Sequence, residues 1–478
     1  MTTQISTTYL SDSEEGDNPF WKSVAVIAGA TLGMATGFGS LILPSMIIVP
    51  IGLEFGWSKS ELSFCYTLAA FGMAVGGLVW GRVSDRLDIR YLLWIGAIFM
   101  IVPMLMMARA NELWQLYVAN AMLGFAGFGC LYPALVSAAG DWFENRRGLV
   151  MGIVTAGGAV GQGLMPFIAD RLFDHIGWRS TFDVIAAMLL IIQYLVVASV
   201  RRRKPMAADA PSAQVATRLS IFATPRIAAL SAAAFLCCAC MGVPLVHLVG
   251  YVNAVCSGSS GLGATSLLVA MTSGAVGRVC FGVFADRFGS LPSYAGASFL
   301  QSVCVLAFPA LQSEASIIVL SAVFGFGFAG NMTCLILCVR KEAPAAQFGG
   351  AIGLVMFVAW LGMGVGGYLG GALFDLTGAY GLSFQIAAAF GAMNLMVLGV
   401  LRLTNATLGK AIAQKFTGTA GGRVAEHHGK DNDAGIAQRF DLTIDPLALV
   451  AGAKLLARLT VGQQENILAA PRLAGILQ

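Results

Sequence analysis

Twelve apolar stretches of about 20 residues recur along the chain, and no other feature constrains the fold as strongly. A helix of about 20 residues crosses the ~30 Å hydrocarbon core of a bilayer, and in lipid only helices and closed barrels satisfy every backbone polar group. We place the stretches at residues 22–48, 62–81, 90–109, 114–139, 148–169, 181–200, 226–252, 262–284, 291–311, 315–339, 349–371 and 381–402. The sequence therefore predicts an all-α membrane protein with twelve transmembrane helices.

The composition agrees with this class. The chain is 57% hydrophobic and 11% charged, whereas soluble domains carry about 25% charged residues. Its net charge of +4 does not indicate a nucleic-acid partner. All ten cysteines fall inside or at the edge of apolar runs, which is typical of small buried hydrophobic residues and not of disulfides or zinc ligands.

The two halves of the chain repeat each other at a constant offset of 201 residues. The matched pairs are Ala74–Gly76 with Ala275–Gly277, Gly81 with Gly282, Asp85-Arg86 with Asp286-Arg287, Gly124-Phe125 with Gly325-Phe326, Gly152 with Gly353, and Leu172–Asp174 with Leu373–Asp375. Chance similarity does not hold one register across four helices. The repeat predicts two pseudo-symmetric six-helix halves with a solute pathway between them.

These signals divide the chain into five parts. We expect a cytoplasmic N-terminal segment at 1–21, the first six-helix half at 22–200, a basic linker at 201–225, the second half at 226–403 and a tail at 404–478. The tail carries no recognisable motif, so a mostly disordered cytoplasmic extension is expected.

The loops differ in their content of Lys and Arg. One set of connections carries thirteen, namely Arg82, Arg86, Arg90, Arg146, Arg147, Arg201, Arg202, Arg203, Lys204, Arg218, Arg287, Arg340 and Lys341, and the other carries Lys59, Arg109, Arg171 and Arg179. Because cytoplasmic loops are the basic ones, we expect both termini in the cytoplasm.

Arg278 is a cation in the otherwise apolar or small run "MTSGAVGRVCFGVF". It lies eight residues before Asp286, which places its Cα roughly 12 Å inside the membrane. Charges at this depth are rare and mark functional sites, because lipid solvates them poorly. A guanidinium matches a carboxylate bidentately, so an organic anion is the predicted ligand. The alternative is a structural arginine that bonds backbone carbonyls near the cytoplasmic edge.

Two copies of a loop motif follow the second and eighth helices, "GRVSDR" at Gly81–Arg86 and "GVFADR" at Gly282–Arg287. Here the sequence resembles the major facilitator superfamily. The resemblance implies a gating loop made of Gly81, Asp85 and Arg86, and of Asp286 and Arg287 in the second half. In physical terms, Gly81 permits close helix approach and Asp85 accepts from neighbouring helix ends.

A narrower resemblance covers most of residues 22–403. The stretches "EFGWSKSELSF", "YPALVSAAGDWFENRRGLVMGIVTAGGAVGQ", "GWRSTF", "HLVGY" and "GRVCFGVFADRFG" are similar to the monocarboxylate porter and oxalate–formate antiporter branch, in its bacterial form. In that branch an eighth-helix arginine binds the substrate carboxylate, which implies this role for Arg278. The first-helix lysine, the acid before the arginine and the eleventh-helix lysine of that branch have no counterparts here, so a monoanion is favoured and coupling stays open.

Several other polar or aromatic residues are candidates for the same pathway. His247 is the second buried ionisable group, and it either carries a proton or is a satisfied structural histidine. Tyr132 and Asn331 are favoured because the resemblance places their helices along the pathway. For Trp360 the resemblance implies a wall of the pathway, with a lipid-facing position as the alternative. Tyr66 completes the set of predicted substrate-binding residues.

The main hypothesis is a secondary transporter of a small organic anion, most consistent with a monocarboxylate, with proton symport or anion exchange. The alternatives are an efflux transporter of drug-like or aromatic compounds and a sensor with a transporter fold. Four scattered histidines and no phosphate-binding loop argue against an enzyme or an ATP-driven pump. We expect no metal or cofactor, a monomer, and a location in a bacterial inner (plasma) membrane.

Overall fold

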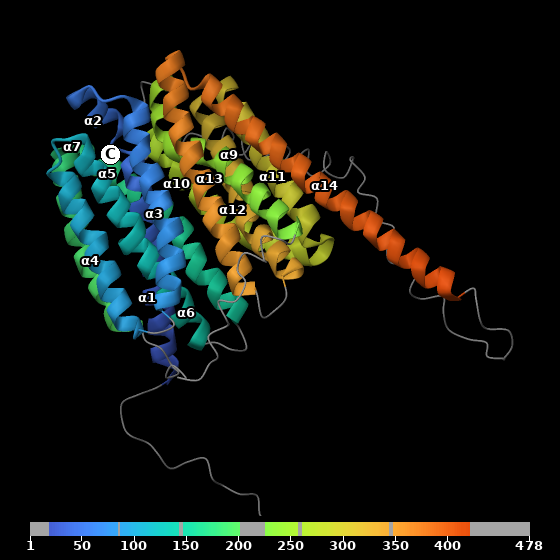
Figure 1. Ribbon diagram of the computed structural model, residues 1–478. Helices are drawn as coiled ribbons and strands as arrows, with labels where there is room; N and C mark the ends of the chain where they lie inside the picture. Colours follow the sequence, from blue (N-terminus) through green and yellow to red (C-terminus); the bar gives the residue numbers. More distant parts are fainter. Residues whose placement is uncertain are drawn as a thin grey trace, which may run out of the picture. The chain divides into compact units, whose positions relative to one another are not determined.

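The computed structural model describes residues 19–84, 87–142, 147–200, 225–256, 261–343 and 348–420, and these residues are helical with short connections. In chain order the elements are α1 (Pro19–Ile42), η1 (Leu43–Ser45), α2 (Ile48–Phe55), α3 (Lys59–Val83), α4 (Ile89–Ala108), α5 (Leu113–Met122), η2 (Leu123–Phe128), α6 (Gly129–Trp142), α7 (Arg147–Ser199), α9 (Pro225–Val255), α10 (Leu262–Phe288), α11 (Ser290–Ala307), η3 (Phe308–Ala310), α12 (Glu314–Glu342), α13 (Phe348–Thr377) and α14 (Gly381–Ala420). In Figure 1 the first half runs from blue to green and the second from yellow-green to orange.

The predicted helix count is confirmed. Among the described residues, eleven helical stretches are long and apolar enough to span a membrane, and one of them, Val150–Ser199, is 50 residues long. Gly177 interrupts this stretch with a left-handed φ of 75°, so α7 comprises two spans. The bend is held by the next two residues, because Trp178 Nε1 and Arg179 Nη1 both donate to the Glu54 carboxylate, at 2.7 and 2.5 Å. With α7 counted as two spans, the described residues contain twelve helices long and apolar enough to cross a membrane.

The described elements alternate between two ends of the helical bundle. The connections α2–α3, α4–α5, α9–α10 and α13–α14 lie at the end where α13 reaches Asp375, and we call this the Asp375 end. The opposite connections include the step from α10 to α11, and we call that the Arg287 end.

The sequence repeat reappears as a repeat of backbone contacts. A Cβ added at any of four glycines would collide with a backbone carbonyl of the neighbouring helix. The pairs are Gly76 against Phe125 with its repeat Gly277 against Phe326, and Gly124 against Ala69 with its repeat Gly325 against Ala270. Every one of these residues has its partner 201 positions later, so equivalent helices pack in the same way in both halves.

The halves meet along two pseudo-symmetric seams, α3 with α13 and α7 with α10. On α7, a Cβ at Gly163 would lie 2.9 Å from the Cα of Leu268. The repeat of this pair is Gly364 with Thr67, where a Cβ would lie 3.4 Å from the Thr67 Cα. Small residues on both seams thus let the backbones of the two halves approach closely.

The chain divides into two compact units, Met1–Gly409 and Lys410–Gln478. The first unit contains every element of both halves, and the second is described only at 410–420, where the backbone is helical. Helix α14 therefore continues beyond residue 403, where the sequence predicted the tail to begin. The rest of that predicted tail, 421–478, lies outside the described residues, as do residues 1–18 and 201–224. All ten cysteines are free, and eight are buried, as expected for small hydrophobic residues.

Candidate functional site

Arg278 lies on α10, and its side chain reaches across to the first half. Its Nη1 donates to the backbone carbonyl of Thr155 on α7, at 2.9 Å. The Nε–H is buried and has no hydrogen-bond partner in the described part of the chain. No carboxylate of the described residues forms an ion pair with it. A guanidinium has five N–H donors, so this cation retains donors for a ligand.

The α7 residues around Thr155 also position an aromatic ring of α1. Gly158 follows Thr155 by three residues and therefore shares its helix face. A Cβ at Gly158 would press on the ring of Phe38, so glycine is what allows Phe38 to lie there. One face of α7 thus carries both the carbonyl that holds Arg278 and the surface against which Phe38 packs.

Three aromatic side chains from three other elements gather around Phe38 of α1. Phe38 lies edge-on to Phe128, with ring centroids 4.7 Å apart, and to Tyr132, at 6.3 Å. Phe128 is the last residue of the π-helical segment η2 and Tyr132 follows one turn later on α6, so both rings point the same way, 5.7 Å apart. Trp360 on α13 lies 6.3 Å from Phe38 with the ring planes inclined by 23°. We call Phe38, Phe128, Tyr132 and Trp360 the aromatic cluster.

The aromatic cluster and Arg278 are neighbours. The Tyr132 hydroxyl and the Arg278 guanidinium are close enough to interact electrostatically. Phe38, Tyr132, Trp360 and Arg278 are all half-buried, so each keeps surface that a ligand can contact. Both halves contribute to the site, since Phe38 and Tyr132 come from the first and Trp360 and Arg278 from the second. The arrangement offers a cation for a negative charge and aromatic faces for an apolar body.

His247 and Tyr66 are placed together elsewhere, around Gly367 of α13. His247 Nε2 contacts the Gly367 carbonyl at 2.8 Å, and because a carbonyl only accepts, Nε2 carries the hydrogen. The Tyr66 ring packs on the same glycine. Gly367 follows Trp360 by seven residues, which is about 10 Å along the helix. The predicted roles of His247 and Tyr66 in substrate binding stay predictions, because the contacts place both toward the Asp375 end from the aromatic cluster.

Asn331 belongs to a polar network inside the second half. Its side-chain amide donates to Gln301 Oε1 at 2.6 Å, and Gln301 in turn donates to the backbone carbonyl of Cys237 at 3.2 Å. Asn331 and Gln301 are fully buried. This chain of bonds joins α12, α11 and α9, which is a helix-packing role, and the prediction that Asn331 binds substrate gains no support from it.

The predicted gating loop is only partly described. Asp85 and Arg86 lie outside the described residues. Asp286 and Arg287 are exposed at the end of α10, and the Arg287 guanidinium lies 5.6 Å from the ring of Phe288. In the conformation described, a Cβ at Gly81 would meet no atom of the described residues within 4 Å, so the close approach expected there stays a prediction. A close approach occurs five residues earlier, at Gly76.

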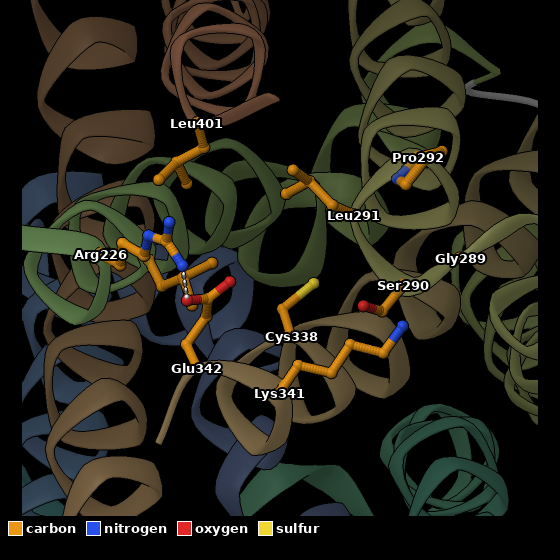
Figure 2. Close-up of a pocket in the computed structure, with 10 residues that line it drawn as sticks. Arg226, Gly289, Ser290, Leu291, Pro292, Cys338, Lys341, Glu342 and Leu401 are labelled. Atoms are coloured by element: carbon orange, nitrogen blue, oxygen red, sulfur yellow. Dashed lines mark hydrogen bonds and ion pairs between the residues drawn. The ribbon is translucent and has the colours of Figure 1, made fainter. Parts of the chain in front are cut away.

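A cavity of about 220 Å³ lies at the Arg287 end of the second half (Figure 2). It is bordered by Arg226, which donates to Glu342 at 2.9 Å, and by Lys341, Cys338 and Ser290. The apolar side chains of Leu291 and Leu401 close its other side (Figure 2). Its lining comes from the second half alone and includes neither Arg278 nor the aromatic cluster, so it is not the site described above.

Comparison with known proteins gives one family and several relatives. A model of the Major Facilitator Superfamily matches residues 27–367. MFS-type transporter 1 of Ophiocordyceps sp. is 28% identical over 360 residues, 74% of this chain and 78% of that protein. The aspyridones efflux protein apdF of Emericella nidulans is 26% identical over 348 residues, 72% of this chain and 69% of that protein.

An animal relative and a solved structure complete the comparison. Monocarboxylate transporter 13 of Rattus norvegicus is 26% identical over 384 residues, 76% of this chain and 85% of that protein. A crystal structure of the nucleoside transporter NupG superposes with a TM-score of 0.68 at 13% identity, over 79% of this chain and 99% of that one. These curated relatives are fungal and animal, so a bacterial-type protein in a bacterial inner membrane is not supported.

Proposed function

The chain belongs to the major facilitator superfamily, and from this premise we propose that it carries an organic anion, held by Arg278, between the two sides of a membrane. The observation that carries the proposal is the half-buried guanidinium with an unpartnered Nε–H and no acidic partner among the described residues. The bond to the Thr155 carbonyl fits the structural alternative, but it occupies a single donor. The carbonyl is neutral, so the guanidinium keeps its full positive charge, which one monoanion would balance.

The mechanism follows from the origin of the site residues. The carbonyl of Thr155 and the rings of Phe38 and Tyr132 belong to the first half, whereas Arg278 and Trp360 belong to the second. When the halves rock about the site, the wall of the pathway opens on one side and then on the other, as alternating access requires. One chain supplies the whole site, so the proposal takes a monomer as the functional unit.

The orientation is part of the proposal. The Arg287 end carries the basic loops, and the positive-inside rule places such loops in the cytoplasm. Both termini and the cavity of Figure 2 are then cytoplasmic, and the Asp375 end faces outward. The names of two relatives, an aspyridones efflux protein and a monocarboxylate transporter, support an exported metabolite or a monocarboxylate as substrate, and Arg278 favours a compound with an anionic group.

The test is uptake of labelled monoanions, dianions and neutral compounds into proteoliposomes, with and without an imposed pH gradient. We expect monoanions to be preferred over dianions, because one cation balances one charge. A response to the gradient indicates proton coupling, and its absence together with trans-stimulation indicates exchange. Transport of neutral compounds alone would reject the anion site.

The aromatic cluster favours a substrate with a planar apolar body, and Trp360→Ala tests this. We expect the KM for an aromatic monoanion to rise about tenfold, since an aromatic contact and its buried area are lost. The KM for a short aliphatic monoanion should change little. Trp94→Ala on α4, whose side chain is 47% exposed, is the matched control. An equal loss for both substrates would argue that Trp360 only supports the fold.

The sensor alternative is tested by deleting residues 421–478. A transporter whose site lies in the first unit should keep its uptake unchanged, measured in the same vesicles at equal protein density. Loss of uptake from a folded truncation would make the tail part of the function and would favour a signalling role.

A further inference from the structure

At the Asp375 end, one carboxylate of the second half bonds the first turn of a helix in the other half. Asp375 Oδ1 accepts from the backbone N–H of Lys59 at 3.1 Å, and Oδ2 accepts from the N–H of Ser60 at 2.7 Å. These groups are among the first N–H donors of α3, which have no partner within their own helix. The positive end of the helix dipole strengthens such bonds to an anion.

A cation–π contact between Lys59 of the first half and two aromatic rings of the second half joins the same two halves. The Lys59 ammonium lies 3.2 Å from the centroid of the Phe374 ring and 4.7 Å from that of Tyr380. Contacts of this kind are attractive through the ring quadrupole. We call Lys59 and Ser60 together with Phe374, Asp375 and Tyr380 the α3–α13 latch. The cation of the latch, Lys59, belongs to the first half, and its anion, Asp375, belongs to the second.

Close backbone packing continues inward from the latch. A Cβ at Gly371 would collide with the carbonyl of Lys59, and one at Gly364 would lie 3.2 Å from a Thr67 methyl. Toward the Arg287 end the packing is looser. A Cβ at Gly353, also on α13, would meet only a Leu78 methyl, at 3.8 Å. Among the described residues, α3 and α13 therefore pack more closely near the Asp375 end than at Gly353.

The latch breaks the pseudo-symmetry of the two seams. The repeat of Asp375 is Asp174, but the repeat of Lys59 is Ser260 and that of Ser60 is Gly261. The second seam consequently lacks an ammonium at the matching position. Charged side chains also lie at this end of the second seam, where a Cβ at Gly261 would be 3.1 Å from Arg171 Nη2 and 3.2 Å from Asp170 Oδ2. There the cation and the carboxylate both belong to the first half, so that contact differs from the latch.

We propose that the α3–α13 latch holds the two halves together at the Asp375 end and that its release is required for the pathway to open there. In the conformation described the latch is formed, and close contacts between α3 and α13 continue inward from it. Weakening the latch should raise the population that is open at the Asp375 end. The inference concerns the conformational equilibrium and not the substrate, so it does not depend on the anion proposed for Arg278.

Hydrogen exchange of the purified, full-length protein without substrate tests the latch. We expect Asp375→Ala to accelerate exchange at least about tenfold at amides of α3 between 59 and 67 and of α13 between 364 and 377, because two charge-assisted bonds across the halves are lost. Lys59→Met, which retains the backbone donors and most of the stem, should accelerate exchange at the same amides to a smaller extent. This variant also serves if Asp375→Ala does not fold.

The matched control is Asp183→Asn. Asp183 accepts from Arg109 at 2.7 Å, and both residues belong to the first half, so this pair does not bridge the halves. Its removal should leave exchange in α3 and α13 unchanged. Acceleration confined to the amides of Lys59 and Ser60, or no acceleration in either latch variant, would overturn the proposal, because the halves would then stay closed without the latch.

Discussion

We expect the Arg278→Ala protein to reach the membrane in normal amounts and to lose organic-anion uptake by at least about a hundredfold. Two hydrogen bonds to a charged group contribute about 1.5–3 kcal/mol each, and every 1.4 kcal/mol is a factor of ten. Initial uptake rates in proteoliposomes, normalised to reconstituted protein, measure the loss. The stability of the fold should hardly change, since Arg278 makes one bond to the first half and its Nε–H none among the described residues.

Two further arginine substitutions separate charge from geometry. Arg278→Lys keeps the cation but not the planar fork, so we expect partial uptake with a raised KM. Arg109→Ala removes an exposed arginine that pairs with Asp183, and its uptake should match the wild type. Full uptake by Arg278→Ala would mean that the arginine is structural and that the substrate binds elsewhere.

The second large effect is expected at Gly76. Its Cα lies so close to the Phe125 carbonyl that even one added carbon would collide with backbone atoms. Overpacking a core costs about 1–3 kcal/mol, and here the neighbour is a helix backbone that cannot rotate away. We therefore expect Gly76→Val to yield little folded protein, measured as the monodisperse fraction in size-exclusion chromatography and as Tm in detergent.

The adjacent residue provides the control for this prediction. A Cβ at Gly77 would have no atom within 4 Å, so Gly77→Val should fold normally although it is the same substitution on the same helix. The repeat adds an independent check, because Gly277→Val should fail as Gly76→Val does. A folded, stable Gly76→Val protein would show that the α3–η2 contact is not needed for the fold.

The fold was largely predictable because lipid restricts the choices. Apolar length and loop charge place the helices, and the boundaries of α10 and α12 differ by a few residues from those expected. Two local features were not predictable. Helix extends on both sides right up to the Gly177 turn, where the sequence predicted a longer connection, and η2 makes part of the fourth span a π-helix next to the backbone of α3.

The site was predictable where it rests on rare side chains. Arg278 stands out because a cation in an apolar run is rare. Tyr132 lies close to it, and Trp360 packs against Phe38 in the aromatic cluster. Phe38 and the carbonyl of Thr155 were missed. A search for ionisable residues passes over a phenylalanine in an apolar helix, and a backbone carbonyl has no signature in the side-chain sequence. The glycines that follow Thr155, in "TAGGAVG", were the available signal for a close approach.

The α3–α13 latch was missed for a related reason. Lys59 appeared in the sequence as a loop cation and Asp375 as part of the repeat, and residues 316 positions apart share no local pattern. Their contact depends on how the halves pack. The role expected for Gly81 came from its motif, and the described neighbours show no close approach there in this conformation.

The most direct test of the central claim compares acids with their neutral amides. Labelled benzoate and phenylacetate, each beside its amide, would be offered to proteoliposomes that contain the wild type or Arg278→Ala. We expect saturable uptake of an acid by the wild type only, with no protein-dependent uptake of the amide. Equal uptake of acid and amide, unchanged in Arg278→Ala, would contradict it and would favour a transporter of neutral, drug-like compounds.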